Sequence, residues 1–303
     1  MNRIDGFVVD PTQITYIGHD LSRPECIIAE RDGTLWIADN RGSITHIEAQ
    51  SGIQRLIGPN EGVPNGIAMT ARGDFVVADI GAGNIYQIDR SGDKKIILDS
   101  LDGKRLGAVN FVYLDEKDRL WVAVSTVTEP RSDALVSVIP DGYILLIDEQ
   151  GTRRVADGLR FTNEIRIDSR GEFLYVAETT AGGITRFRVA ADGSLDEREK
   201  FGPMPFFEGA MVDGIAFDVD GNLWVTEVTR NQIVVLKPDG TALTVFDDPA
   251  GTTIDFPTSV TFGGDDLQTV YVGSLKMSRI ATFRSPVAGV PMRHWQKGTE
   301  RTD

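Results

Sequence analysis

The stretch GTLWIAD, at residues 33–39, returns in altered form five more times along the chain, and this repetition decides the expected fold. The later copies are GDFVVAD from Gly73, DRLWVAV from Asp118, EFLYVAE from Glu172, GNLWVTE from Gly221 and QTVYVGS from Gln268. Each copy is a short run of β-branched and aromatic residues, which is typical of a β-strand. The copies lie roughly 40 to 50 residues apart, a period that overlaps those of propeller repeats.

Each copy belongs to a larger unit. A short apolar run and a polar turn precede it, as in IIAERDG and IAFDVDG, where Asp and Gly favour the tight turn of a β-hairpin. A third run such as QIVVLK follows, and then a weaker fourth run such as ALTVFDD. Four antiparallel strands taken six times predict an all-β fold, a six-bladed β-propeller that spans residues 1–303 as a single domain.

The ring of a propeller closes when both ends of the chain meet in one blade. The segment QITYIGHD, residues 13–20, resembles the fourth-strand segments. We therefore expect residues 12–18 to complete the blade that begins near Thr258. The segment VPMRHW, residues 290–295, competes for the same place, and the sequence does not decide between them.

Composition limits the functional classes. Apolar residues make up 41% and charged residues 25%, as in globular proteins with a substantial core. A net charge of -14 argues against a nucleic acid or an anionic membrane as partner, because such partners require clustered Lys and Arg. A single cysteine, Cys26, excludes an internal disulfide. With neither a secretion signal nor a membrane span in the sequence, we expect a cytoplasmic protein of open oligomeric state.

One position stands out when the repeats are aligned on their second strands, namely the residue just before the first strand. This position is occupied by Glu25, Asn65, Asn110, Asn163, Asp213 and Thr258. In a propeller the first strand of each blade lines the central channel, so these six side chains are expected to form a ring at one opening.

The chemistry of this ring favours a metal. Its carboxylates and amides all offer oxygen, and carboxylates without a counter-charge are costly to bury. One divalent cation in the central channel, bound by Glu25, Asn163 and Asp213, would remove that cost, and an all-oxygen shell suits a hard cation. For Asn65 and Thr258 the formation of turns is the better interpretation, and Asn110 lies between the two.

Three segments carry a family resemblance: RPECIIAERDGTLWIADNRG, FTNEIRIDSRGEFLYVAETT and VDGIAFDVDGNLWVTEV. They resemble motifs of the senescence marker protein / gluconolactonase / luciferin-regenerating enzyme family, and the resemblance covers nearly the whole chain. It implies a propeller with one catalytic divalent cation that hydrolyses a lactone to its hydroxy acid. Glu25, Asn163 and Asp213 match the metal ligands of that family, and Asn110 matches an asparagine near metal and substrate. Calcium is the first choice, with Mn²⁺, Mg²⁺, Zn²⁺ and Fe²⁺ open.

The chain also departs from the family pattern. Cys26-Ile27 stands where Gly-Pro is common, and Phe111 stands where Asp is common. An arginine that grips sugar lactones in some members falls near Ala108 and is absent here. The proposed metal ligands are retained despite these departures, whereas the resemblance does not imply a sugar-acid substrate.

The resemblance also suggests roles in catalysis. Asp213 is the candidate general base beside an attacking water, and Asn110 is a candidate catalytic contact to the substrate. Proximity to the cation would lower the pKa of Asp213, so a water activated by the cation without a protein base is the alternative. Cys26, one residue after Glu25, is expected to be buried and to face away from the ring if the strand is regular.

The loops beside the ring are expected to set specificity. The long segment 125–142 is expected to cover the pocket and to offer Glu129 and Arg131 to the substrate. Lys104 and Arg105 are expected near Asn110. Phe206 and Phe207 suggest an apolar wall ahead of Asp213, with ordinary packing as an equal alternative.

The predicted function is therefore metal-dependent hydrolysis of a small lactone, either of a sugar acid or of a more apolar acid. Two alternatives remain open. One is a phosphotriesterase of the diisopropyl-fluorophosphatase type, which also holds calcium with Glu, Asn and Asp. The other is a non-enzymatic interaction propeller, which has no need of two carboxylates and an amide at matching positions.

Overall fold

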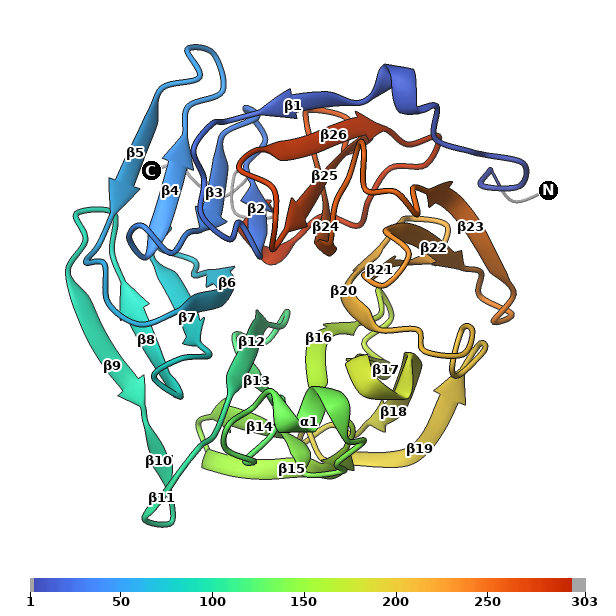
Figure 1. Cartoon of the computed structure of the whole chain (residues 1–303). Helices are drawn as coiled ribbons and strands as arrows, with labels where there is room; N and C mark the ends of the chain where they lie inside the picture. Colours follow the sequence, from blue (N-terminus) through green and yellow to red (C-terminus); the bar gives the residue numbers. More distant parts are fainter. Residues whose placement is uncertain (1–2, 296–303) are drawn as a thin grey trace.

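The computed structural model describes residues 3–295, and Figure 1 shows them as six antiparallel sheets around a central axis. Each sheet has four strands in sequential order, so the predicted six-bladed β-propeller is confirmed. Blades 1 to 3 are β2 (Ile27–Ala29), β3 (Leu35–Ala38), β4 (Ile44–Ile47) and β5 (Gln54–Ile57); β6 (Pro64–Met69), β7 (Phe75–Asp79), β8 (Asn84–Ile88) and β9 (Lys94–Leu98); and β12 (Val109–Leu114), β13 (Leu120–Val124), β14 (Gly142–Asp148) and β15 (Gly151–Leu159). Blades 4 to 6 are β16 (Thr162–Ile167), β17 (Phe173–Glu178), β18 (Gly183–Val189) and β19 (Leu195–Phe201); β20 (Val212–Phe217), β21 (Leu223–Glu227), β22 (Gln232–Leu236) and β23 (Ala242–Asp247); and β24 (Pro257–Gly263), β25 (Thr269–Ser274) and β26 (Ile280–Arg284) with β1 (Thr15–Ile17).

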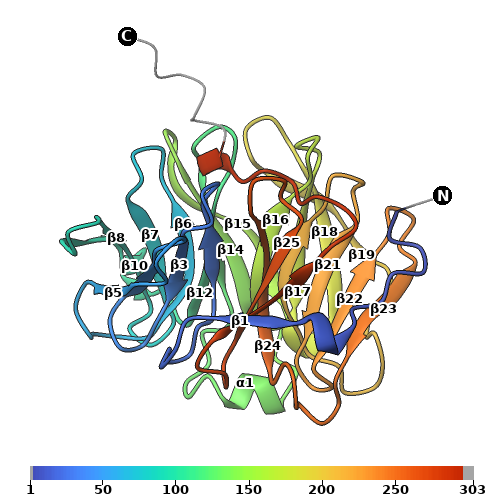
Figure 2. The same ribbon diagram turned by 90° about the horizontal axis from the view of Figure 1, so that it is seen from above.

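The N-terminal segment closes the ring. Strand β1 pairs antiparallel with β26, with Tyr16 opposite Ala281, so the prediction for residues 12–18 is confirmed. The competing segment 290–295 runs instead to the mouth of the channel opposite the short helix α1 (Asp133–Val136) (Figure 2). There the indole Nε1 of Trp295 donates a hydrogen bond of 2.8 Å to the carbonyl oxygen of Ala29.

A repeated acidic residue ties the turn of three blades to the tryptophan of the second strand. The acid lies six residues before the tryptophan and accepts a hydrogen bond from the indole Nε1. The pairs are Trp36 with Glu30 at 2.9 Å, Trp121 with Asp115 at 2.9 Å and Trp224 with Asp218 at 3.0 Å. The indoles are buried and contribute to the packing between blades, since the Trp36 ring lies 4.9 Å from Phe75 and the Trp224 ring 5.5 Å from Phe262. The sequence repeat therefore encodes the turn and the blade contact together.

The first strands line the channel side by side. Each first strand packs against the first strand of both neighbouring blades, around the full ring from β2 to β24 and back. In five of the six blades the pairing of the first strand with the second is interrupted by a shift in register near its start. Such a bulge leaves residues outside the regular alternation and re-aims their side chains.

Short elements outside the blades complete the fold. They are η1 (Pro11–Gln13), the hairpin β10 (Ser100–Leu101) and β11 (Lys104–Arg105), helix α1, and η2 (Thr179–Ala181). Helix α1 lies within segment 125–142 and, in Figure 1, in front of blade 3 at one side of the channel. Among residues 3–295 no helix has the length and apolar character that crossing a membrane requires.

Candidate functional site

The six ring positions meet in one narrow cavity on the channel axis. Glu25, Asn110, Asn163 and Asp213 line it and are only 5%, 2%, 4% and 8% exposed. The other lining residues are Cys26, Asn65, Gly66, Phe111, Glu164, Thr258 and Ser259. The cavity volume is about 10 Å³, which is close to the space that one water molecule needs.

Bulges at the start of the first strands aim these side chains at the axis. The register of β16 against β17 shifts between Thr162 and Ile165, and Asn163 lies within that step. The register of β20 against β21 shifts between Val212 and Ile215, and Asp213 lies within it. Two successive residues, Asn163 and Glu164, therefore both line the cavity, which regular alternation would not allow.

The strands approach one another too closely for side chains at two positions. A Cβ atom on Gly214 would lie 2.5 Å from the carbonyl oxygen of Thr258, and one on Gly66 would lie 2.7 Å from the Cα of Phe111. Glycine after Asp213 and after Asn65 therefore permits the narrow spacing of the ring.

Cys26 borders the cavity, and its side chain is buried, as expected. Its sulfur lies 3.8 Å from the carbonyl oxygen of Ile67, and it packs with Ile28 in an apolar cluster, whereas Ile27 packs in another. Cys26 and Ile27 therefore alternate between the two faces of the blade, as the prediction assumed. Burial, together with the nearby charge of Glu164, raises the pKa of the thiol to about 12, which leaves it inert.

Buried negative charge dominates the electrostatics of the cavity. Burial raises the pKa of Glu25, and Arg23 partly offsets this effect. Burial and then repulsion from Glu25 and Glu164 raise the pKa of Asp213 well above its usual range. Burial also raises the pKa of Glu164 to about 7, although Arg166 pairs with it. These carboxylates therefore lack sufficient positive charge nearby.

Hydrogen bonds fix the amides of the ring. Asn163 Nδ2 donates to Thr179 Oγ1 at 3.0 Å, which leaves its carbonyl oxygen for the cavity. Asn65 Nδ2 donates to both the backbone oxygen and Oδ1 of Asn110, each at 3.0 Å. Asn65 thus orients Asn110, in keeping with the structural role predicted for Asn65.

The donor set fits a hard divalent cation. Glu25 Oε2 and Asn65 Oδ1 are buried and accept no hydrogen bond within residues 3–295. The described chain contains no group of three His, Cys, Asp or Glu residues in metal-binding arrangement, so an ion here would rely on amide oxygen as well as carboxylate. Two carboxylates match the charge of one divalent ion, and oxygen ligands suit calcium, magnesium or manganese.

Two functional residues were missed by the sequence reasoning. Arg23 Nη2 lies 3.3 Å from Glu25 Oε2, an ion pair without the geometry of a hydrogen bond. Glu164 Oε2 accepts a 2.9 Å hydrogen bond from the backbone nitrogen of Ile215 in the next blade. Both residues lie next to predicted ligands, in RPEC and TNEI, and charged residues beside a buried ligand position were the available signal.

The predicted substrate contacts divide into two groups. Burial is the main cause of the shifts in the pKa values of Glu25 and Arg131, and the charge of each also acts on the pKa of the other. Glu129 is directed to Arg105, with 3.9 Å between Oε1 and Nη1, and both side chains are largely exposed. Lys104, also exposed, lies in β11 with Arg105 and outside the cavity. These three residues therefore do not line the small cavity, and a contact between any of them and a substrate stays a prediction.

The apolar wall is also corrected. Phe206 packs against the buried cluster of blades 4 and 5 around Tyr175, Val212 and Leu223. The guanidinium of Arg230 lies 3.9 Å from the centroid of the Phe207 ring. Ordinary packing, the alternative interpretation, explains Phe206, since neither ring lines the cavity.

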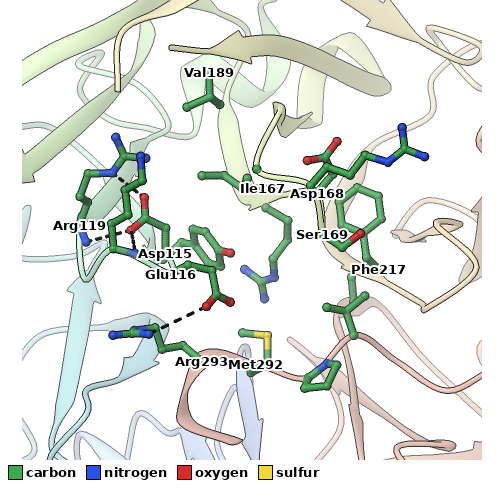
Figure 3. A pocket seen from close by; sticks show the side chains of 18 of the residues that line it. Asp115, Glu116, Arg119, Ile167, Asp168, Ser169, Val189, Phe217, Met292 and Arg293 are labelled. Carbon is green, nitrogen blue, oxygen red and sulfur yellow. Dashed lines mark hydrogen bonds and ion pairs between the residues drawn. The ribbon is translucent and has the colours of Figure 1, made fainter. Parts of the chain in front are cut away.

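The widest cavity lies at the opposite mouth of the channel (Figure 3). It has a volume of about 510 Å³ and contains none of the predicted site residues. Several of its charged side chains form ion pairs, as Arg119 does with Asp115 at 2.7 Å. Arg166 lies between the two mouths. It lines the wide cavity and pairs with Glu164, which lines the narrow one. Its Cζ atom lies 4.7 Å from the centroid of the Phe111 ring.

Comparison with known proteins agrees with this geometry. The family model for the SMP-30/Gluconolactonase/LRE-like region matches residues 23–276. A 6-deoxy-6-sulfogluconolactonase from Pseudomonas putida is 26% identical over 69% of this chain and 68% of its own length. The pentonolactonase XacC from Haloferax volcanii is 26% identical over 80% of each chain. The diisopropyl-fluorophosphatase of Loligo vulgaris is 24% identical over 77% of this chain and 80% of its own.

Solved structures share the fold at lower identity. A gluconolactonase from Xanthomonas campestris superimposes with a TM-score of 0.74 at 19% identity, over 96% of this chain and 93% of its own. The calcium-binding protein regucalcin from Agrobacterium tumefaciens gives 0.72 at 15% identity, over 96% and 97%. At these identities the structural similarity shows the propeller fold alone. The chemistry has to be inferred from the residues of the site.

Proposed function

This chain belongs to the SMP-30/gluconolactonase/LRE-like family, and we propose that it hydrolyses a sugar-acid lactone with the help of one divalent cation bound by Glu25, Asn163 and Asp213. The relatives named as lactonases support the reaction class. The observation that carries the proposal is the cavity itself. Three oxygen-bearing side chains from blades 1, 4 and 5 meet there, and the pKa values of both carboxylates are raised, chiefly by burial.

When bound, the cation supplies Lewis-acid polarisation of the lactone carbonyl and electrostatic stabilisation of the oxyanion that develops as the ring opens. Calcium is our first choice, in line with the oxygen donors and with the calcium-binding neighbour of the same fold. The other divalent ions named above remain to be compared by experiment.

Two residues of the chain have roles in the proposed reaction: one deprotonates the attacking water, and the other orients the lactone. Asp213 is the candidate to accept the proton of the attacking water, because it is a carboxylate on the wall of the cavity. Asn110 Oδ1 accepts from Asn65, so its amide nitrogen is available to donate to the lactone carbonyl oxygen. The near-complete burial of both side chains excludes competing water.

The size of the cavity supports a position of the lactone outside it. A volume of about 10 Å³ is far below the roughly 300 Å³ of small ligand pockets, so the substrate ring lies on the solvent side of Glu25 and Asp213. Helix α1 of segment 125–142 lies beside the channel, in front of blade 3 (Figure 1). Because Phe206 is committed to packing, the structure no longer favours an apolar lactone over a polar one.

Metal content and a substrate panel test the proposal together. Purified protein is expected to hold one divalent ion per chain by mass spectrometry, and chelation is expected to lower Tm because the ion stabilises only the folded state. Glu25→Gln is expected to abolish both the ion and the Tm shift. Glu61→Gln, an exposed glutamate outside the cavity, is the control.

Activity is then measured on sugar-acid lactones, an apolar lactone and an organophosphate in parallel. Preferred hydrolysis of the sugar-acid lactones is the expected result. Preference for the organophosphate would establish the phosphotriesterase alternative, and metal-free protein without any hydrolysis would return the chain to the class of interaction propellers.

A further inference from the structure

Glu164 links the two neighbouring blades that carry Asn163 and Asp213. Strands β16 and β20 lie side by side (Figure 1), but each sheet is confined to one blade, so no sheet hydrogen bond joins the two strands in the described chain. The side chain of Glu164 crosses this gap, and its Oε2 accepts a hydrogen bond of 2.9 Å from the backbone nitrogen of Ile215. One end of the link is thus adjacent to Asn163, and the other end lies two residues after Asp213.

The bulge in β20 is held from both sides. The two backbone nitrogens that follow Asp213 both donate to side chains, that of Gly214 to Thr226 Oγ1 at 2.8 Å and that of Ile215 to Glu164. Thr226 belongs to β21 of the same blade, whereas Glu164 belongs to blade 4. A buried backbone nitrogen without an acceptor is costly, so the carboxylate of Glu164 contributes to the path of the backbone directly after Asp213.

The carboxylate of Glu164 is itself held at both oxygens. Its Oε1 forms an ion pair with Arg166 Nη2, while its Oε2 binds Ile215. Arg166 in turn donates from Nη1 to the carbonyl oxygen of Ile165 at 3.0 Å. Glu164 and Arg166 are only 3% and 8% exposed, so little water competes for these contacts. Glu164 is therefore a fixed support for its neighbours.

The backbone around this link has little room to move. A Cβ atom on Gly214 would lie 2.9 Å from Glu164 Oε2 and 2.5 Å from the carbonyl oxygen of Thr258. The carboxylate thus occupies space that a side chain at position 214 would fill, and the backbone of blade 6 closes the other side. The hydrogen bond from Ile215 therefore restrains blade 5 against blade 4 at the level of the ring.

We propose that Glu164 is a positioning residue for the cation: its hydrogen bond to Ile215 fixes the spacing of Asn163 and Asp213 and so sets the affinity of the ring for a divalent ion. This inference rests on the proposed metal-dependent function and extends it to a residue outside the proposed ligand set. Groups that orient metal ligands contribute about ten- to a hundredfold to metal affinity.

The test compares two double variants that differ only in the acceptor at position 164. Both Glu164→Gln/Arg166→Met and Glu164→Leu/Arg166→Met remove the whole ion pair, so the net charge of the cavity is the same in each. Gln keeps an oxygen that can accept from Ile215, whereas Leu has a similar size and no acceptor. The Kd for Ca²⁺, measured by competition with a chelator, is expected to rise about tenfold or more in the Leu variant and to stay close to the wild-type value in the Gln variant.

Two further measurements separate positioning from a role in stability alone. Hydrogen exchange of the Ile215 amide reports whether the link is present, and urea denaturation of the metal-free protein reports the stability of each variant. If Glu164 only stabilises the fold, the Leu variant will lose stability with an unchanged Kd. If the Leu variant does not fold, Glu164→Asp replaces it, because a side chain one methylene shorter keeps the charge for Arg166 but withdraws from Ile215. The same rise in Kd is then expected.

The outcomes distinguish this inference from the proposed function. A raised Kd in the Leu variant, without lactone hydrolysis by the wild-type protein, would uphold the positioning role and refute the lactonase. An equal Kd in the two double variants, whether raised or not, would overturn the positioning role while leaving the metal site and the lactonase intact. A wild-type protein that binds no divalent ion would overturn both.

Discussion

At the mouth of the channel beneath α1, the acids outnumber the bases close to them, and the pKa values of Glu25 and Asp213 are raised. At the opposite mouth, acids and bases of the wide cavity pair across short distances, as Arg293 does with Asp118 at 2.6 Å and with Glu116 at 3.9 Å. The same six first strands build both ends.

The two mouths therefore show that volume alone does not identify a site. Several charged side chains of the wide cavity of about 510 Å³ form ion pairs, whereas the carboxylates Glu25 and Asp213 of the narrow one of about 10 Å³ have raised pKa values. Clefts with perturbed carboxyl groups and convergent polar atoms are the stronger candidates for chemistry. Substitution of matched acidic residues at the two ends tests this difference between the mouths.

Asp213→Asn is expected to have the largest effect. Loss of the carboxylate removes a proposed proton acceptor and a proposed ligand, so kcat/KM for the preferred lactone should fall about 10²- to 10⁴-fold. Glu116→Gln, which neutralises an acid at the opposite mouth, is the matched control and is expected to leave kcat/KM unchanged. The comparison would fail if the Glu116 variant lost as much activity as the Asp213 variant.

Glu164→Gln is expected to act mainly on stability. The substitution leaves buried Arg166 without its partner, and breaking a buried pair costs about 3 to 5 kcal/mol. We expect about 3 kcal/mol, at the low end of that range, because burial already raises the pKa of Glu164 to about 7 and so weakens its charge at neutral pH.

Urea denaturation at pH 8, where Glu164 is more fully ionised, measures this cost. The double variant Glu164→Gln/Arg166→Met removes the stranded charge and should recover part of the lost stability. No recovery in the double variant would mean that the hydrogen bond to Ile215, rather than the charge pair, carries the effect.

The repeat pattern predicted the blades, the closing strand and the ring because each depends on residues close in sequence. A polar residue before the first strand recurs in all six blades, and a turn acid with a buried tryptophan six residues later recurs in three of them. The symmetry of the repeats then places these residues in space. Glu25, Asn163 and Asp213 could therefore be brought together from the sequence alone.

The remaining features depend on local irregularity, which the repeat does not encode. Bulges in the first strands bring Glu164 to the cavity beside Asn163. Arg23, with its φ of 54°, has left-handed backbone geometry that strand periodicity does not predict. The outward path of the β10–β11 hairpin and the packing of Phe206 were likewise set by tertiary contacts.

The smallest effect is expected from Arg293→Gln. Arg293 forms a two-pronged contact with Asp118, with Nε to Oδ1 at 2.9 Å and Nη2 to Oδ2 at 2.6 Å, but the acid is largely exposed. Exposed ion pairs contribute up to about 1 kcal/mol to the free energy of unfolding, and salt weakens them. Urea denaturation at low and high salt should show a small loss of stability that shrinks with salt, while lactone kcat/KM stays at the wild-type value. A loss of activity here without a loss of stability would show that the wide mouth takes part in the reaction.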